Sequence, residues 1–220
     1  LKPCEAESLK MFTLSDRKVL VTGASGGIGG AIARALYAQG ATVALAGRNR
    51  EALDALAVEL GDRSHVVVGD LGDTASADAM MSAGADAMGG IDILVNNAWG
   101  GGHVGRIENK SVDTMNHGLG VGFLGPFWAM QAAHKIMKPA GYGRIINICS
   151  LNGVNAHMGT AEYNTSKEAL RAASRTAARE WAESGITCNV ICPAAKSAAF
   201  HSMMDKHPEL LASTDATNPM

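Results

Sequence analysis

No apolar run in the sequence approaches the roughly 20 residues that a helix needs to cross a bilayer. The N-terminal segment LKPCEAESLK also lacks the apolar stretch of a signal peptide. Charge of one sign is not in excess: the net charge is −2, which gives no electrostatic reason to expect nucleic acid or an anionic membrane as a partner. Neither kind of partner is therefore expected.

Cysteine is scarce as well, with four residues in the chain: Cys4, Cys149, Cys188 and Cys192. They lack the paired spacing of metal ligands, so no metal site is expected. Cys188 and Cys192 lie in one apolar run, where buried thiols are the better interpretation and a disulfide or zinc site is the alternative. Reduced, cytoplasmic chemistry is the expectation that follows.

Short apolar runs alternate with longer, alanine-rich amphipathic segments along the chain. With 220 residues and a hydrophobic content of 47%, a single domain with one substantial core is favoured. The runs are nearly continuous in apolar residues, which is typical of strands buried on both faces of a parallel sheet. Strands are expected over 18–23, 42–47, 65–70, 93–98, 144–150 and 186–193, and helices over 27–39, 50–60, 74–88, 111–138 and 162–184.

This alternation predicts an α/β fold, a doubly wound parallel sheet of the Rossmann type in a single domain. Residues 1–17 precede the first strand as an N-terminal extension, and 18–220 form the domain. Ligands of such sheets bind beyond the carboxyl ends of the strands, where the strand order reverses. The motifs described below lie at such strand ends.

The segment TGASGGIG, residues 22–29, follows the first strand and opens the first helix. Glycines at this place let the backbone turn tightly and approach a pyrophosphate, while the helix N-terminus offers free N–H groups. Two glycine patterns fit the segment, with either Gly26 or Gly27 in the middle position. Gly23 and Gly29 belong to both patterns.

The second strand ends in LAGRNR, with Gly47 where an NAD-preferring enzyme places a carboxylate and Arg48 next. A cation suits the 2′-phosphate of NADP(H), so NADP(H) is the expected cofactor. The alternative is a solvated Arg48 at a helix start, where a positive charge is slightly unfavourable. Asp70, in GDL after the third strand, either accepts a hydrogen bond from the adenine amine or caps the following loop.

The segment EYNTSK, residues 162–167, places Tyr163 and Lys167 four positions apart in an expected helix. Residues at this spacing are neighbours on one side of a helix. A tyrosine hydroxyl titrates near about 10, and a nearby ammonium favours its phenolate, so Lys167 is expected to lower the pKa of Tyr163. The alternative, an ordinary surface pair, is what an isolated helix would favour.

From about Lys18 to Pro193 the chain resembles the short-chain dehydrogenase/reductase (SDR) family, in its single-domain branch. The resemblance rests on TGASGGIG, GDL, NNA, YNTSK and CNVICP, and on Ser150 thirteen residues before Tyr163. It implies that Ser150, Tyr163 and Lys167 form the catalytic set. The resemblance also decides between the two glycine patterns, and the cofactor contacts that it implies in this segment are Gly23, Ser25, Gly27, Ile28 and Gly29. The other cofactor contacts that it implies are Arg48, Asp70, Leu71, Asn97, Ala98, Tyr163, Lys167 and Pro193.

The resemblance implies hydride transfer between NADP(H) and a hydrophobic ketone or secondary alcohol. Negative charge develops on the carbonyl oxygen during such a reduction. Tyr163 is then the general acid, Ser150 binds the carbonyl oxygen, and Lys167 tunes the tyrosine and binds the nicotinamide ribose. The alternative is a non-catalytic NADP(H)-binding sensor or interaction protein on the same fold.

Three positions depart from the family pattern. Gly122 stands where the family has an asparagine, and we expect its backbone carbonyl, turned out of the helix, to hold the water of a proton relay. Trp99 replaces a glycine beside the cofactor, and it either forms a wall of the substrate pocket or is plain packing. In CPAAKSAAF, Ala194 replaces a glycine and Ala198 stands near the usual threonine position, with Ser197 one position earlier.

Apolar residues occur in the segments expected around the reacting carbonyl, which indicates a hydrophobic substrate. They are Trp99, Leu151, Met158, Phe200, Met203 and Met204. His103 and His157 either orient a polar group of the substrate or lie exposed in loops. A substrate lid is expected near 194–220, and the chain ends before the seventh strand of the family. The alanine-rich helix over 162–184 implies, by the same resemblance, a homodimer or homotetramer, although packing within the chain also uses alanines.

Overall fold

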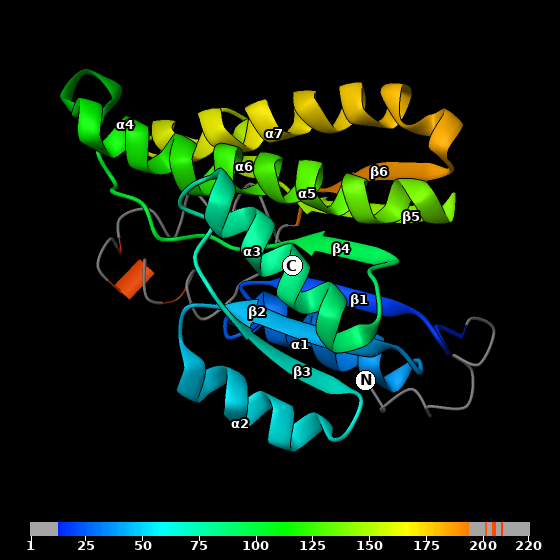
Figure 1. Ribbon diagram of the computed structural model, residues 1–220. Helices are drawn as coiled ribbons and strands as arrows, with labels where there is room; N and C mark the ends of the chain where they lie inside the picture. Colours follow the sequence, from blue (N-terminus) through cyan, green and yellow to red (C-terminus); the bar gives the residue numbers. More distant parts are fainter. Residues whose placement is uncertain (1–12, 194–200, 202–203, 206–207, 209–220) are drawn as a thin grey trace, which may run out of the picture.

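A computed structural model describes residues 13–193, 201, 204, 205 and 208. This part of the chain contains a six-stranded parallel sheet in the order β3-β2-β1-β4-β5-β6 (Figure 1). The strands are β1 (Lys18–Thr22), β2 (Thr42–Gly47), β3 (Ser64–Val68), β4 (Ile93–Asn96), β5 (Gly143–Ile148) and β6 (Ile186–Ile191). The chain winds from β1 outward to β3 and then, from β4, the other way to β6, so the predicted doubly wound sheet is confirmed.

Helices cover both faces of the sheet (Figure 1). On one side lie α1 (Gly27–Ala38) and α2 (Arg50–Leu60), and on the other lie α3 (Thr74–Met88), α5 (Gly125–Ala140) and α7 (Ala161–Glu180). Shorter elements are η2 (Ile107–Asn109), α4 (Val112–Leu119), η3 (Gly120–Leu124), α6 (Leu151–Val154) and η4 (Ala182–Ser184).

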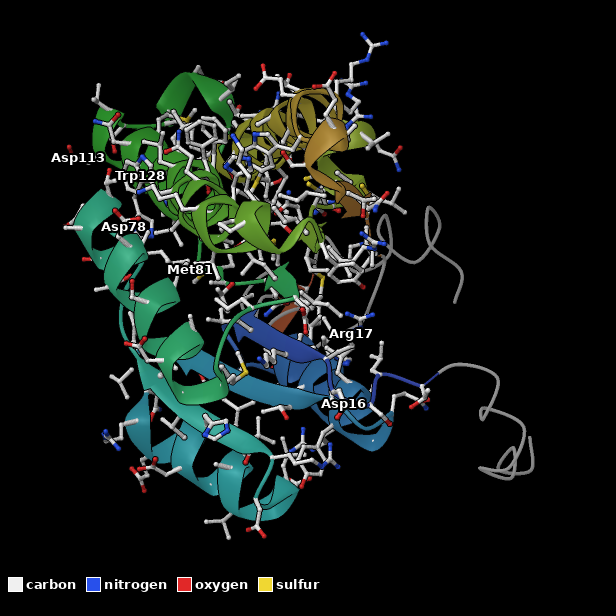
Figure 2. The ribbon with its side chains drawn as sticks, turned by 45° about the vertical axis from the view of Figure 1, so that its right-hand side comes forward. Asp16, Arg17, Asp78, Met81, Asp113 and Trp128 are labelled. Carbon is white, nitrogen blue, oxygen red and sulfur yellow. The ribbon has the colours of Figure 1, made fainter. Side chains whose placement is uncertain are left out.

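Two apolar layers hold the helices on the sheet. Alternate residues of β1 enter different layers: Leu20 packs with α3, α5 and α7, whereas Val19 and Val21 pack with α1 and α2. Met81, which Figure 2 labels on α3, is fully buried in the first layer. Both faces of the strands are therefore buried, as the continuous apolar runs indicate.

The helix expected over 111–138 is divided into α4, a π-helical turn η3 and α5. Pro126 supplies a reason, because it has no N–H to donate to the carbonyl of Gly122 as an α-helix requires. In η3 the backbone N–H of Gly125 instead reaches the carbonyl of Gly120, five residues back. A backbone departure from the α-helix is thus present at Gly122, where the sequence analysis places one.

Several expectations fall on segments that the structure does not describe. They concern the extension over 1–12, most of the lid near 194–220, the seventh strand, and the residues Cys4, Ala194, Ser197, Ala198, Phe200 and Met203. Met204 is described and is 5% exposed. Within the described residues, no helix is both long and apolar enough to cross a membrane.

Candidate active site

The glycine-rich turn between β1 and α1 lies at the point where the strand order reverses. A Cβ at Gly23 would lie 2.8 Å from Cα of Ala98 in the loop after β4. Gly23 also has a φ of +66°, a left-handed conformation that glycine adopts at little cost. At Gly29 a Cβ would lie 2.2 Å from the carbonyl oxygen of Gly23. Both patterns considered for this segment contain Gly23 and Gly29, and close backbone packing requires glycine at both.

The start of α1 fits an anionic group. Gly26 is the N-cap, and no side chain caps this helix, so the N–H groups of the first turn lack a protein side-chain partner. A Cβ at Gly27 would meet nothing within 4 Å, and Ser25 is exposed beside it. The backbone is therefore open where a pyrophosphate would bind, and the half-buried Ile28 lies at the same turn.

Thr22, which the sequence analysis did not single out, joins this turn to the loop after β4. Its buried hydroxyl donates to the carbonyl of Val95 at 3.3 Å. The same oxygen accepts from the backbone N–H groups of Asn97 and Ala98 at 3.0 and 3.2 Å. The Asn97 side chain in turn donates to the carbonyls of Thr22 and Gly23 at 3.1 and 3.3 Å. Asn97 and Ala98 therefore fix the shape of the turn.

At the ends of β2 and β3, Arg48 and Asp70 form an ion pair with 3.7 Å between their charged atoms. Both side chains are more than half exposed, and exposed pairs of this kind are weak. Of the two roles considered for Asp70, capping is performed by another residue at α3: Asp73 accepts from the backbone N–H of Ser76 at 2.8 Å. Leu71 is buried next to Asp70.

Ser150 and Tyr163 meet at the carboxyl end of β5, where the serine hydroxyl lies near enough to the phenol to affect its pKa. Ser150 is also the N-cap of α6, and its Oγ accepts from the backbone N–H of Asn152 at 3.1 Å. This cap fixes the position of the serine hydroxyl. Burial raises the pKa of Tyr163, and the neighbouring Ser150 hydroxyl lowers it by less, so the pKa lies above its ordinary value.

Lys167 lies behind this pair and is 3% exposed. Its Nζ donates to the carbonyl oxygen of Ile148 at 2.8 Å and lies 5.8 Å from the centroid of the Tyr163 ring. Burial lowers the pKa of Lys167 to about 8, although Cys149 opposes the change. The expectation that Lys167 lowers the pKa of Tyr163 is wrong for this arrangement, because burial dominates the phenol's pKa.

Trp99 follows Ala98 at the start of the loop after β4 and lines the candidate site. Its ring meets the Tyr163 ring edge to face, with 4.7 Å between centroids and 74° between planes. The indole is half-buried. Of the two roles considered for Trp99, a wall of the site therefore describes its position better than core packing does.

A second buried lysine lies on the other side of the first turn of α7. Lys110 forms an ion pair with Glu162, with 2.5 Å between Nζ and Oε2 and side chains 3% and 1% exposed. Glu162 Oε1 accepts from the backbone N–H of His103 at 2.9 Å. Burial raises the pKa of Glu162, but the bonds from Lys110 and from backbone N–H groups outweigh it, and the pKa is lowered. The ion pair ties the loop between β4 and α4 to α7.

A cavity of about 420 Å³ lies beside this loop. It is lined by Gly100, Gly101, Gly102, His103, Asp113, Thr114, His117 and Glu162. Asp113 is labelled at the outer end of the helical layer in Figure 2. Within the part of the chain that the structure describes, the lining does not include Ser150, Tyr163 or Lys167, so the cavity is distinct from the predicted catalytic set.

The remaining candidates lie apart from this set or have other partners. His157 donates from Nδ1 to the carbonyl of Met158 at 3.1 Å, so its ring has a local partner. Cys149, Cys188 and Cys192 are free thiols. The interpretation of Cys188 and Cys192 as buried thiols is confirmed for Cys188, whereas Cys192 is half-buried. Pro193 follows β6 and is half-buried. Among the described residues, no group of three or more His, Cys, Asp or Glu could hold a metal ion.

Comparison with known proteins places this geometry in a family. Residues 17–208 match the family described as short chain dehydrogenase. Nodulation protein G of Rhizobium sp. (strain N33) is 39% identical over 214 residues, covering 96% of this chain and 86% of that protein. The uncharacterized oxidoreductase YxjF of Bacillus subtilis is 37% identical, covering 79% of this chain and 68% of that protein. The chain therefore belongs to the short chain dehydrogenase family of oxidoreductases.

Solved structures agree with this assignment. A putative short-chain alcohol dehydrogenase from Sinorhizobium meliloti is similar with a TM-score of 0.81 and 35% identity, covering 91% of this chain and 82% of that one. An NAD⁺-bound xylitol dehydrogenase has a TM-score of 0.79 and 32% identity, covering 81% and 70%. A 3-ketoacyl-(acyl-carrier-protein) reductase from Brucella melitensis, complexed with NADH, has a TM-score of 0.82 and 26% identity, covering 86% and 80%.

Proposed function

We propose that the protein transfers hydride between NADP(H) and a hydrophobic ketone or secondary alcohol, with Tyr163 as general acid and base. The observation that carries the proposal is that the buried Ser150 lies beside the half-buried Tyr163, with the Lys167 ammonium 5.8 Å from the centroid of the phenol ring. Burying a lysine beside a neutral carbonyl is costly. Strongly perturbed groups of this kind are typical of catalytic sites.

Each residue of the set has a defined task in the reduction. A bound reduced nicotinamide supplies the hydride that forms the new C–H bond at the carbonyl carbon. The electron pair of the carbonyl bond moves to its oxygen, which Ser150 holds by a hydrogen bond and to which Tyr163 donates its proton. The raised pKa of Tyr163 keeps the phenol protonated at neutral pH, which suits the reductive direction. The phenolate then regains a proton that comes from solvent.

Lys167 and Gly122 support the proton transfer. An ammonium has three N–H donors, and one of those of Lys167 is engaged by Ile148. The others suit the hydroxyl groups of a nicotinamide ribose. Because Pro126 cannot donate to the Gly122 carbonyl, that oxygen is suited to hold a water of the relay that returns the proton to Tyr163.

The preference for NADP(H) rests on Arg48. It follows Gly47 at the end of β2, and its ion pair with Asp70 is exposed and weak, so a 2′-phosphate could replace the carboxylate. The xylitol dehydrogenase and the 3-ketoacyl reductase were solved with NAD⁺ and NADH, which supports a nicotinamide cofactor of either kind. We expect Arg48→Glu to weaken NADPH binding by about tenfold or more while NADH binding changes little. Equal affinity of wild type for both cofactors would remove the role given to Arg48.

The hydrophobic substrate and the assembly rest on exposed apolar surface. Leu151, Val154 and Met158, at and after α6, are 38%, 47% and 72% exposed, and their position after Ser150 suits contact with an apolar ketone.

On α7, Ala177 is buried within the chain while Ala172 is exposed, so part of the alanine surface remains for a homodimer or homotetramer in the cytoplasm. Light scattering of the purified protein measures this association.

The test of the proposal is oxidation of NADPH in the presence of bulky aryl, alicyclic and steroidal ketones. We expect turnover in wild type and a loss of about 10²- to 10⁴-fold in Tyr163→Phe, with NADPH affinity retained. Tyr142→Phe is the matched control, because Tyr142 contacts Arg17 and Arg144 at the opposite end of β5. Tight NADPH binding without turnover on any ketone or alcohol would contradict the proposal and favour a cofactor sensor.

A further inference from the structure

Trp99 is held on three sides by parts of the chain that are distant in sequence. Its ring lies edge to face against Tyr163 of α7, with 4.7 Å between centroids. On a second side, a Cβ at Gly122 of η3 would lie 2.8 Å from the indole Cζ3. On the third, a Cβ at Gly102 would lie 3.3 Å from Cζ2. A side chain at Gly122 would overlap the ring, and one at Gly102 would press against it.

The contact with Gly122 links two features that the sequence presents separately. A Cβ at Gly122 would also lie 2.3 Å from Oγ of Ser166, a residue of α7. That hydroxyl donates to the carbonyl of Tyr163, one turn earlier in the same helix, at 2.8 Å. The indole and Ser166 therefore occupy the space that a residue-122 side chain would need. The tryptophan at position 99 and the glycine at position 122 therefore depend on each other sterically.

The indole also bears on the charged member of the set. The Nζ of Lys167 lies 5.8 Å from the Trp99 ring centroid, the same distance as from the Tyr163 ring. At about 6 Å or less a cation is attracted to the face of an indole. The ring thereby adds apolar cover to an ammonium that has a neutral carbonyl as its hydrogen-bond partner.

We propose that Trp99 is a positioning residue for the Tyr163–Lys167 pair, which its indole orients by ring contact and shields from water. This role rests on the proposed function, since it presumes that Tyr163 exchanges protons with a substrate. In this role the ring increases the rate of proton transfer and leaves the affinity for the cofactor unchanged. Gly122 is required because Ser166 and the indole together fill the position of its side chain.

Substitutions of graded similarity test this role. Trp99→Phe keeps an aromatic ring and is expected to retain kcat within about threefold, whereas Trp99→Leu keeps apolar bulk without a ring and is expected to lose between about 10- and 100-fold in kcat. KM for NADPH stays within about threefold in both, because the ring acts on proton transfer. Trp128→Phe, on α5 and packed against the core, is the matched control.

The pH profile separates positioning from simple packing. Water that enters beside Lys167 in Trp99→Leu would raise the lowered pKa of that ammonium and lower the raised pKa of Tyr163. The limbs of the kcat profile should therefore move in Trp99→Leu and stay in place in Trp128→Phe. A Trp99→Leu enzyme with wild-type kcat and an unchanged pH profile would overturn the inference.

A spectroscopic measurement needs neither turnover nor a change at residue 99. In the double variant Trp128→Phe/Trp181→Phe, Trp99 is the remaining tryptophan, so its emission reports on the site directly. We expect this emission to be quenched on adding NADPH and to change with pH, with the pH response altered by adding Tyr163→Phe. Emission that responds neither to NADPH nor to pH contradicts the inference. Absence of ketone turnover together with these responses would instead refute the proposed function alone.

Discussion

The side chain of Lys110 is 3% exposed and Lys167 as a whole residue is 3% exposed, yet the surroundings of the two ammonium groups differ. Lys110 faces the carboxylate of Glu162, so its charge is neutralised inside the protein. Lys167 donates to the neutral carbonyl of Ile148, and burial lowers its pKa to about 8. The two sites are adjacent, because Glu162 and Tyr163 are consecutive residues of α7.

The difference separates a structural charge from a functional one. An ion pair with additional hydrogen bonds offsets the cost of burying its charges. Glu162 Oε2 pairs with Lys110, and Oε1 accepts an additional hydrogen bond from the backbone N–H of His103. A buried ammonium beside a neutral group keeps most of that cost, and such local destabilisation is common at functional sites. We therefore interpret Lys110 as an anchor of the loop and Lys167 as a group held for the reaction.

The largest expected effect separates the two lysines by activity. Lys167→Met should lower kcat/KM for NADPH oxidation by about 10²- to 10⁴-fold, because it removes the cation from the catalytic set. The double variant Lys110→Met/Glu162→Gln, which removes both charges of the anchor, should retain activity within about tenfold. Steady-state kinetics on both variants measures the contrast. Equal losses in the two would show that the anchor and the catalytic set cannot be separated.

The next effect concerns stability, for which we expect Lys110 to matter more than Lys167. Lys110→Met alone leaves the Glu162 carboxylate buried without its cation, which should cost about 3 kcal/mol or more of unfolding free energy. Adding Glu162→Gln should recover most of this loss. The Glu162 pKa is lowered from its ordinary 4.5, so its stabilising contribution is present above that pH and is lost as the pH falls through the folded pKa. Urea unfolding of the single and double variants measures these free energies. If the double variant is no more stable than Lys110→Met alone, the pairing of Lys110 with Glu162 is refuted.

The smallest effect is expected at an exposed ion pair. Arg34 and Glu59 form a close pair at 2.6 Å, but their side chains are 50% and 51% exposed. Solvent screens such pairs, so Arg34→Met should leave the urea midpoint unchanged within experimental error. A loss as large as that of Lys110→Met would mean that burial is not what distinguishes the anchor.

Much of the fold could be predicted because its signals are local. Each strand is a continuous apolar run, and the glycine-rich turn at residues 22–29 identifies the switch point. A carbonyl turned out of the helix was expected at Gly122, but the π-helical turn that divides the helix over 111–138 was missed, since the pattern continues through this segment and only the missing N–H of Pro126 marks the division. The site residues could be placed at strand ends for the same local reason.

The interactions that were missed join residues far apart in sequence. Lys110 has the pattern of a loop residue and Glu162 that of a solvated helix residue, and neither indicates burial by itself. Trp99 and Gly122 were noted separately, but their contact depends on how η3 packs against the loop after β4. The pKa of Tyr163 was assigned the wrong direction because spacing on a helix gives proximity but does not give burial.

The central claim is that Lys167 carries an uncompensated buried charge. Its pKa falls from 10.5 to about 8, so the unfolded chain binds more protons between these pH values and the penalty fades as the pH rises through this window. Cys149 and Cys188 act in the opposite sense, because burial raises the pKa of each from 9.0 to about 11, so the stability that they contribute is lost as the pH rises through that range. Both cysteines are present in wild type and in Lys167→Met, so their contribution largely cancels in the difference between the two unfolding free energies.

The most direct measurement is the unfolding free energy of wild type and Lys167→Met from pH 7 to about 10.5. At pH 7 we expect Lys167→Met to be the more stable, by an amount on the order of 3 kcal/mol, with the gap closing as the pH approaches 10.5. The account would be contradicted if Lys167→Met were less stable than wild type at pH 7, or if the difference between the two unfolding free energies did not change with pH.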